Sequence, residues 1–299
     1  MGKYIRCIVL LLLIAAAVCL GIRFYPVWKA ARYLHENMDL AHYAYELEME
    51  LDSGALRREY GSMFTVLTGM TGFEEDALCH LTVRGNVWED TIHVLLYPQG
   101  AGNPLVELYL GNDMDVINET LIYHAVRSHL AEQFRLFGLV LPEQEESLYM
   151  SLEQVEQMFG LDLESVRNFG LPFTGGKISA VRYFILLAVM DREKGEGRSL
   201  YSLETGQMAA GIELPEGGSD VPLTIRLHIE KPGETDEKIL GIISRLGFPV
   251  DRGRLSMVKS ISLTMVPGGN EIVMPENFVN QTVVELISRI RELLIKLFG

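Results

Sequence analysis

Cysteine is scarce in this chain of 299 residues, and the few cysteines are unevenly placed. Two of the three, Cys7 and Cys19, fall within the first 32 residues, and Cys79 is the only one after them. A single cysteine cannot form a disulfide within the body of the protein, so a fold held by internal disulfides is excluded. The length suffices for one or two domains with a hydrophobic core.

Acidic residues are absent from the first 32 positions, which carry five basic residues. The rest of the chain has 21 Lys and Arg against 40 Asp and Glu, which gives it a formal net charge of −19. A surface of that charge repels the phosphate backbone of nucleic acids, and no cluster of basic residues interrupts it. Nucleic acid is therefore not an expected partner.

Sequence signatures of catalysis and of cofactor binding are also missing. The chain has no G-x-S-x-G, H-E-x-x-H or C-x-x-C motif and no phosphate-binding loop. His35, Asp39 and His42 have helical spacing, and His80 and His93 fall on one predicted hairpin. A solvated polar face explains both groups better than a metal site does. We accordingly predict no catalytic residue, no metal site and no cofactor.

The longest apolar run covers residues 7–22, which are sixteen positions without a charge. As a helix this run would extend about 24 Å, slightly less than the ~30 Å hydrocarbon core of a bilayer. Arg23 can reach the interface along its own apolar stem, and the aromatic residues that follow suit the same depth. Residues 1–28 are therefore predicted to be a signal anchor that contacts the lipid membrane through residues 5–28.

Other interpretations of residues 1–28 stay open. Three alanines at 15–17 suit a cleaved signal peptide, Cys19 is a candidate for lipidation although Val18 stands where a small residue is wanted, and a buried core helix is a further alternative. Basic residues flank the run on both sides, so their count does not decide the orientation. First hydrophobic segments usually leave the body outside, so we expect a single-pass protein of the cell membrane with an extracytoplasmic body.

Beyond the apolar run, hydrophobic periodicity predicts an α+β fold. Residues 27–42 have helical periodicity, and residues 43–52 alternate strictly between an apolar and a largely acidic side, as a half-buried strand does. Further strands are expected at 105–110, 116–123, 199–205, 208–214, 221–230, 255–266 and 271–274. Further helices are expected at 124–137, from 152 onward, at 178–193, at 235–246 and at 276–298. The predicted fold is a curved antiparallel sheet, or sheets, packed with helices and preceded by one transmembrane helix.

A β-hairpin is predicted over residues 78–97, where two alternating runs flank Gly85 and Asn86. This dipeptide suits a tight two-residue turn. With that turn, Val83 would pair with Trp88 on the apolar face of the hairpin.

Turn-rich and charged stretches suggest how the chain is divided. We predict the anchor at 1–28, a helix with antiparallel strands at 29–137, a connecting region at 138–177, and further helices and strands at 178–299. Whether 29–137 and 178–299 form one continuous domain is left open by the sequence.

A membrane-directing segment, a helix and then alternating antiparallel strands that begin at 43–52 resemble the bacterial lipoprotein-carrier superfamily, in which a curved half-barrel sheet wraps around helices. The resemblance covers residues 27–123 and extends to the strands at 199–275, while the lipobox of the anchored members is absent or degenerate at Cys19. It implies a hydrophobic cleft for a lipid or an acylated ligand. The residues that the resemblance places in this cleft are Tyr43, Tyr45, Leu47, Trp88 and Ile92. The same residues also suit an ordinary core.

These observations lead to an expected function rather than an expected reaction. We predict a membrane-anchored, extracytoplasmic, non-enzymatic module for binding or envelope assembly, with an apolar or lipid-like ligand. One alternative is a structural module that docks another membrane protein. Another is an anchored hydrolase whose catalytic residues assemble from distant positions.

Overall fold

The computed structural model describes residues 24–111, 114–133, 146–159, 177–216, 220–232 and 256–279. Several predicted segments lie outside these described residues. They are the apolar run at 7–22, the helix at 235–246, most of the connecting region at 138–177 and nearly all of the helix at 276–298.

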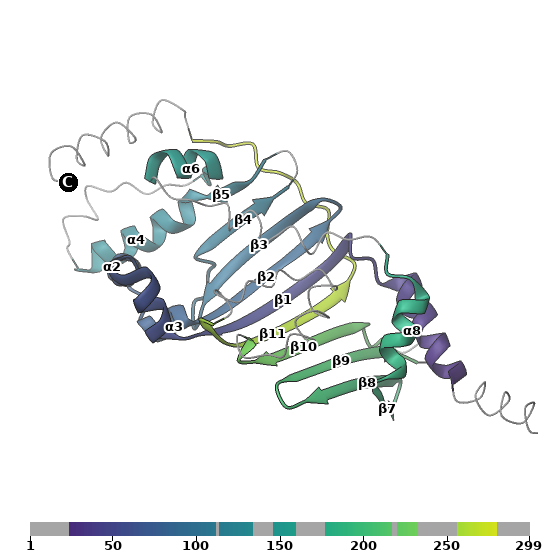
Figure 1. Cartoon of the computed structure of the whole chain (residues 1–299). Coiled ribbons are helices and arrows are strands. Elements are labelled where there is room, and N and C mark those ends of the chain that lie inside the picture. The colour runs from purple at the N-terminus through teal and green to yellow at the C-terminus, as the bar shows by residue number, and fades with distance from the viewer. Residues whose placement is uncertain are drawn as a thin grey trace, which may run out of the picture.

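One antiparallel sheet of eleven strands forms the centre of the fold (Figure 1). Its strands are β1 (His42–Leu51), β2 (His80–Trp88), β3 (Thr91–Pro98), β4 (Val106–Leu110), β5 (Val116–Asn118), β6 (Tyr149–Ser151), β7 (Asp191–Gly195), β8 (Arg198–Thr205), β9 (Met208–Pro215), β10 (Thr224–Glu230) and β11 (Val258–Pro267). The order across the sheet is β6-β5-β4-β3-β2-β1-β11-β10-β9-β8-β7. The first and last strands are therefore central neighbours, and the open sheet has its edges at β6 and β7. The predicted α+β class with an antiparallel sheet is confirmed.

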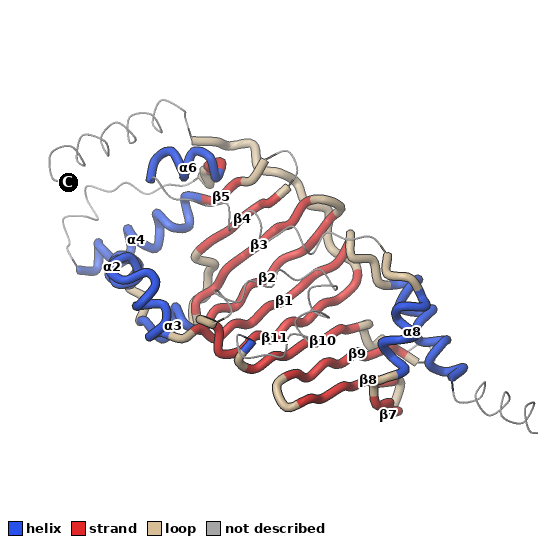
Figure 2. The backbone as a smooth tube through the Cα atoms, in the orientation of Figure 1, coloured by secondary structure: helices blue, strands red, loops and turns tan. Residues whose placement is uncertain are grey.

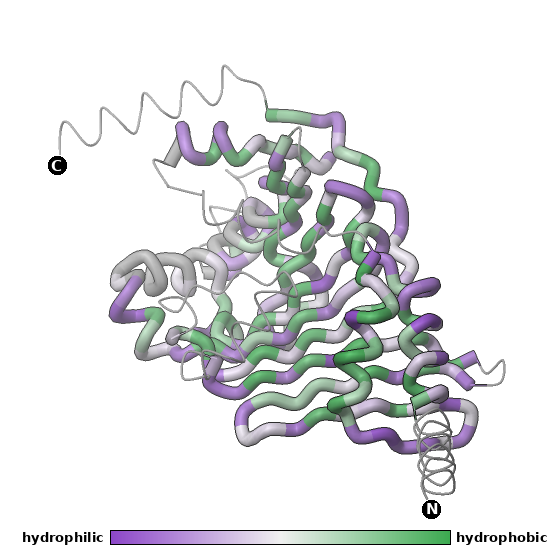
Figure 3. The backbone as a smooth tube through the Cα atoms, turned by 45° about the vertical axis from the view of Figure 1, so that its right-hand side comes forward, coloured by the Kyte–Doolittle hydropathy of each residue, from purple (hydrophilic) through white to green (hydrophobic). Residues whose placement is uncertain are grey.

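The described helices gather at two sides of the sheet (Figure 2). They are a helix over 24–37, α2 (Ser53–Thr71), α3 (Glu75–Cys79), α4 (Glu119–Gln133), α6 (Leu152–Phe159) and α8 (Ala180–Ala188). The helix over 24–37 and α8 lie together beside β7–β9, whereas α2, α3 and α4 lie at the opposite side (Figure 1). Figure 3 brings the end with α8 forward and shows hydrophobic and hydrophilic residues interspersed along the strands.

The main core lies between the apolar face of the sheet and the helices over 24–37 and α8. Leu34 and Met38 are fully buried there, together with Tyr43 of β1 and Leu187 of α8 at no more than 1% exposure. The alternation along β1 explains this arrangement, because every second residue of a strand points to the same face. Strands from both predicted segments, 29–137 and 178–299, therefore contribute to one core.

The predicted turn at Gly85 and Asn86 is wrong. β2 continues through both residues, and the turn lies at 89–90, where Glu89 takes a left-handed φ of 54°. Trp88 pairs with Thr91 and not with Val83, so it lies on the opposite face of β2 from Val83.

A close approach of neighbouring strands explains the glycine at this position. A Cβ atom on Gly85 would lie 1.9 Å from the backbone oxygen of His93 and 2.8 Å from the Tyr45 hydroxyl. The sequence needs glycine here for space within the sheet and not for a turn.

Several other boundaries also differ from the prediction. The strand expected at 116–123 ends at Asn118, where the helix α4 begins, and the helix expected at 178–193 ends at Ala188, before β7. The charged residues of β7 pair with β8 at the exposed edge of the sheet, where charge is tolerated. Residues 271–274 are extended but form no strand, and α2 had no predicted counterpart.

Candidate functional site

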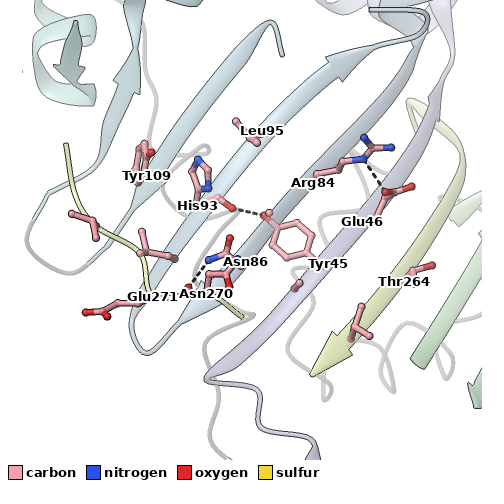
Figure 4. A pocket seen from close by; sticks show the side chains of 15 residues that line it. Tyr45, Glu46, Arg84, Asn86, His93, Leu95, Tyr109, Thr264, Asn270 and Glu271 are labelled. Atoms are coloured by element: carbon pink, nitrogen blue, oxygen red, sulfur yellow. Dashed lines mark hydrogen bonds and ion pairs between the residues drawn. The ribbon is translucent and has the colours of Figure 1, made fainter. Parts of the chain in front are cut away.

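A groove of about 740 Å³ lies on the polar face of the sheet (Figure 4). The extended residues 268–279, which we call the strap, form one wall, and β1–β4 with β11 form the rest. The lining residues combine apolar and polar groups: Ala44, Tyr45, Glu46, Arg84, Gly85, Asn86, His93, Leu95, Tyr109, Thr264, Val266 and 270–273. A concave site with mixed walls and a few converging polar groups is typical of small-molecule binding.

The strap is fixed to the sheet at both of its ends. Near its start, the Asn86 side-chain amide donates a hydrogen bond to the backbone oxygen of Asn270 at 2.8 Å. Near its end, the Tyr149 backbone N–H donates to the Asn277 oxygen, and the Val279 N–H donates to the Tyr149 oxygen, both at 2.9 Å. The strap therefore extends from β11 to the edge strand β6 and gives the groove a defined wall.

The strap also lies very close to the backbone of the central strands. A Cβ atom on Gly269 would lie 2.6 Å from the Val87 oxygen and about 3 Å from the backbone of Tyr43. Only glycine fits this approach, so this position specifies where the strap crosses the sheet.

A hydrogen-bonded cluster around Glu107 lies beside the groove. Oε1 of Glu107 accepts from Nε2 of His93 at 2.9 Å and from the Tyr109 hydroxyl at 3.0 Å. Oε2 accepts from the Asn118 amide at 2.7 Å and from the Tyr149 hydroxyl at 3.5 Å. The rings of His93 and Tyr109 stack with their centres 4.5 Å apart. The cluster ties β3, β4, β5 and β6 together.

The electrostatics of this cluster favour a permanent carboxylate. Hydrogen bonding from His93 outweighs the effect of burial and, with the bonds from Asn118 and Tyr109, lowers the pKa of Glu107 to about 2. Burial and the neighbouring carboxylate raise the pKa of the Tyr109 and Tyr149 hydroxyls. Glu107 therefore holds no proton to donate at neutral pH, and its four donors already occupy both oxygens. This arrangement suits a rigid support beside the groove better than a general acid or base.

The accessible polar groups of the groove lie on β1 and β2. Nε of Arg84 donates to Glu46 at 2.8 Å, and both side chains are at least two-fifths exposed. The Arg84 guanidinium also lies 5.5 Å from the centre of the Tyr97 ring. A ligand with a polar or charged group can exchange bonds with this exposed pair at low energetic cost.

The structure separates the residues that the resemblance placed in an apolar cleft. Tyr43, Leu47 and Ile92 are 0–7% exposed in the main core, and Tyr45 is partly buried against the same cluster while bordering the groove. Trp88 lies on the other face of β2, where its ring packs against His42 with ring centres 4.5 Å apart. Four of the five residues are thus brought together, and Trp88 is not among them.

The two histidine groups are not assembled into larger clusters. His35 bonds through Nδ1 to the backbone oxygen of Ile178 at 2.8 Å, whereas His42 lies 3.5 Å from Asp39. His80 and His93 lie at different ends of the β2–β3 pair. Across the described ranges, no group of three His, Cys, Asp or Glu side chains is placed to hold a metal ion.

Sequence reasoning missed Glu107, Tyr109 and Tyr149 as parts of one cluster. The sequence predicted a strand over 105–110, which contains the first two, but their partners come from three other strands. His93 lies opposite Tyr109 in the β3–β4 register, which is set by the connection between Pro98 and Val106 and has no local signal in the sequence.

No protein-family model matches this chain, and comparisons with curated proteins and with solved structures find no match either. In the part of the chain that the structure describes, no helix has the length and hydrophobicity needed to cross a bilayer.

Proposed function

We propose that this chain is a membrane-anchored, extracytoplasmic binding module that holds an amphipathic, lipid-like ligand in the groove beneath the strap. The observation that carries the proposal is the groove itself, whose fixed wall and mixed lining are built by residues from six segments of the described chain, with the rigid Glu107 cluster beside it.

Membrane anchoring is supported by the uncharged run at 7–22 and by the surface next to it. The described helix over 24–37 begins one residue after Arg23, and Tyr25 and Trp28 in its first turns are 68% and 40% exposed. Phe24 and Trp28 pack on Phe184 of α8, with ring centres 5.9 Å apart in both pairs. Exposed aromatic side chains at this point suit the interface of a bilayer.

The exposed side of α8 adds to this apolar surface. Val181, Ile185 and Val189 follow each other at intervals of four residues and are 56–65% exposed. Residues four apart lie on the same face of a helix, so they form one continuous stripe. Large exposed apolar surfaces mark contacts with membranes or with other proteins.

An amphipathic ligand is supported by the chemistry of the groove. Leu95, Val266 and the aliphatic residues of the strap provide apolar contacts, whereas Arg84 and Glu46 provide an exposed pair of charges. The volume of about 740 Å³ lies within the range of about 300–1,000 Å³ that ligand sites usually have.

Anchoring and sidedness are tested together on the full chain in cells. We expect the protein to stay in the membrane pellet after an alkaline wash and to be digested by protease added to intact cells. As a control, Leu12→Arg with Ala16→Arg should release the protein from the pellet, because two charges in the run oppose insertion. Release of the unsubstituted chain, or its protection in intact cells, would contradict the proposal.

The ligand is tested by extraction of the purified full chain with organic solvent and mass spectrometry. Thr264→Trp fills the groove from β11, and Ser260→Trp adds the same bulk on the same strand face outside it. We expect a lipid-like compound to copurify with the original protein and with Ser260→Trp but not with Thr264→Trp. An equal yield from both variants, or no compound from any protein, would refute a ligand in this groove.

Docking of another membrane protein is a second candidate, and the stripe on α8 is the observation that favours it. A photoreactive amino acid at Ile185 separates the two functions. Adducts of a single discrete protein mass would support docking, whereas lipid adducts alone would support contact with the bilayer.

A further inference from the structure

We propose that a second pocket, between the start of the helix over 24–37 and the strands β7–β9, binds the phosphate group of an anionic phospholipid. The pocket has a volume of about 620 Å³. This inference goes beyond the groove, and its assignment to a lipid rests on the proposed membrane anchoring.

Cationic side chains gather at this pocket, in a protein whose body is strongly acidic. Lys29 lies on the helix, and Arg192 and Lys194 lie on β7, whereas Glu216 is the acidic residue of the lining. The surface therefore has two more positive than negative side chains at this site. Phosphate groups are bound in proteins by such combinations of lysine and arginine.

Two polar groups in the pocket wall have no hydrogen-bond partner. Tyr201 is 1% exposed and its hydroxyl is buried without a partner among the described residues, and the same is true of Nε of Arg192. The Arg192 guanidinium carbon lies 5.7 Å from the centre of the Tyr201 ring, so the two residues that carry these atoms are neighbours. Leaving buried donors unpaired is costly, so a small side-chain shift that brought either donor against a ligand oxygen would be favourable.

The rest of the arginine is held in place. Nη2 of Arg192 donates to the Ser199 hydroxyl at 3.1 Å and to Glu216 at 3.2 Å, and the Ser199 hydroxyl also donates to Glu216. These bonds orient the guanidinium and leave Nε for another acceptor. Because Ser199 and Glu216 already hold its guanidinium in place, Arg192 can bind an oxyanion without a large loss of side-chain entropy.

The position of the pocket points to a phosphate at a membrane surface. Tyr25 and Pro26, two and three residues after Arg23, form part of the lining. The exposed residues Ile185, in α8, and Val189, which caps it, lie shortly before β7 and its two cations in the chain. Apolar side chains next to cations match a phospholipid, whose acyl chains and phosphate adjoin in the same way.

The test uses the full chain in uncharged detergent micelles and native mass spectrometry. The probes are phosphatidylglycerol, phosphatidylcholine with the same acyl chains, and inorganic phosphate. We expect phosphatidylglycerol to bind at least about tenfold more tightly than phosphatidylcholine, and Lys29→Gln with Lys194→Gln to abolish this preference. The matched control, Arg58→Gln with Lys177→Gln, removes the same charge from exposed positions elsewhere and should change binding less than twofold.

Tyr201→Phe provides a variant that keeps the fold. It removes only a hydroxyl without a partner, so the thermal midpoint should not fall, while affinity for phosphatidylglycerol should fall about fivefold or more. If millimolar inorganic phosphate displaces phosphatidylglycerol, the site is a phosphate site whose ligand is free phosphate. If it does not, the ligand is the lipid. Equal binding of both lipids by the original protein, or full binding by the lysine variant, would overturn the inference. Neither result depends on the alkaline wash, so the site and the anchoring can fail separately.

Discussion

Replacing Glu107 with glutamine tests whether the cluster beside the groove depends on a carboxylate. Both oxygens of Glu107 accept hydrogen bonds, from His93 and Tyr109 on one side and from Asn118 and Tyr149 on the other. An amide offers one accepting oxygen and one donating nitrogen. Glu107→Gln therefore leaves at least two donors facing another donor, and it removes the charge that strengthens all four bonds.

The size of the effect follows from the pKa of Glu107, which the cluster lowers from an ordinary value of 4.5 to about 2. A tenfold change in proton affinity corresponds to about 1.4 kcal/mol, so the carboxylate contributes about 3 kcal/mol to stability at neutral pH. Because the pKa is lower in the folded than in the unfolded chain, this contribution is present above about pH 4.5 and is lost as the pH falls toward 2. About 2 kcal/mol of it is gone at pH 3.

The measurement is urea unfolding of the full chain in uncharged detergent, followed by the fluorescence of its two tryptophans, at pH 7 and pH 3. The free energy of unfolding should differ between the original protein and Glu107→Gln by about 3 kcal/mol at pH 7 and by about 1 kcal/mol at pH 3. Glu46→Gln is the matched control, because its exposed ion pair with Arg84 should contribute less than about 1 kcal/mol at either pH. A difference for Glu107→Gln that is the same at both pH values would refute the reasoning.

Three further substitutions test the packing, each by urea unfolding at pH 7. Gly85→Ala should lower the free energy of unfolding by about 2–3 kcal/mol, since the new methyl group meets the His93 carbonyl, while Gly206→Ala, with open space around it, should change it by less than about 0.5 kcal/mol. The Ser151 hydroxyl caps α6 by accepting a hydrogen bond from the Gln154 backbone N–H at 3.1 Å. Ser151→Ala removes this cap and should lower the free energy of unfolding by about 1 kcal/mol; an unchanged value would argue against the cap. Leu34→Ala should cost about 3 kcal/mol, and a loss below about 1 kcal/mol would show that the helix over 24–37 is not part of the core.

Strands with strict alternation could be predicted from the sequence because one of their faces is buried. β1 differs from the predicted 43–52 by one residue at each end, and β8 and β9 by one residue at most. The start of α6 at Leu152 also agrees with the helix expected from 152 onward, and it is marked by a local capping box in which Ser151 and Gln154 bond reciprocally to each other's backbone N–H. These signals are local, so no knowledge of distant contacts was needed.

The failures concern residues whose roles are set by distant parts of the chain. Gly85 has the local signature of a turn, yet it is required by the close approach of Tyr45 and of the His93 carbonyl, neither of which is near it in sequence. The cluster around Glu107 depends in the same way on the registers of four strands. A single residue of error in any of these registers would place the side chains on opposite faces.

The helix over 24–37 links the proposed anchor to both candidate binding sites. Ala31, Leu34 and Met38 are fully buried, so this segment is part of the core and not a flexible tether. If the chain is anchored as proposed, this rigid segment leaves the bilayer at about Arg23 and fixes the orientation of the sheet relative to the membrane, because the core cannot rotate without breaking its packing. The second pocket adjoins the first turns of this helix and therefore lies at the level of the lipid headgroups if the chain is anchored.

The groove lies on the opposite face of the sheet. It is lined in part by β1, the strand that comes directly after this helix in the chain. Anchoring would thus place the phosphate site at the bilayer surface and direct the groove away from the helices that pack on the apolar face.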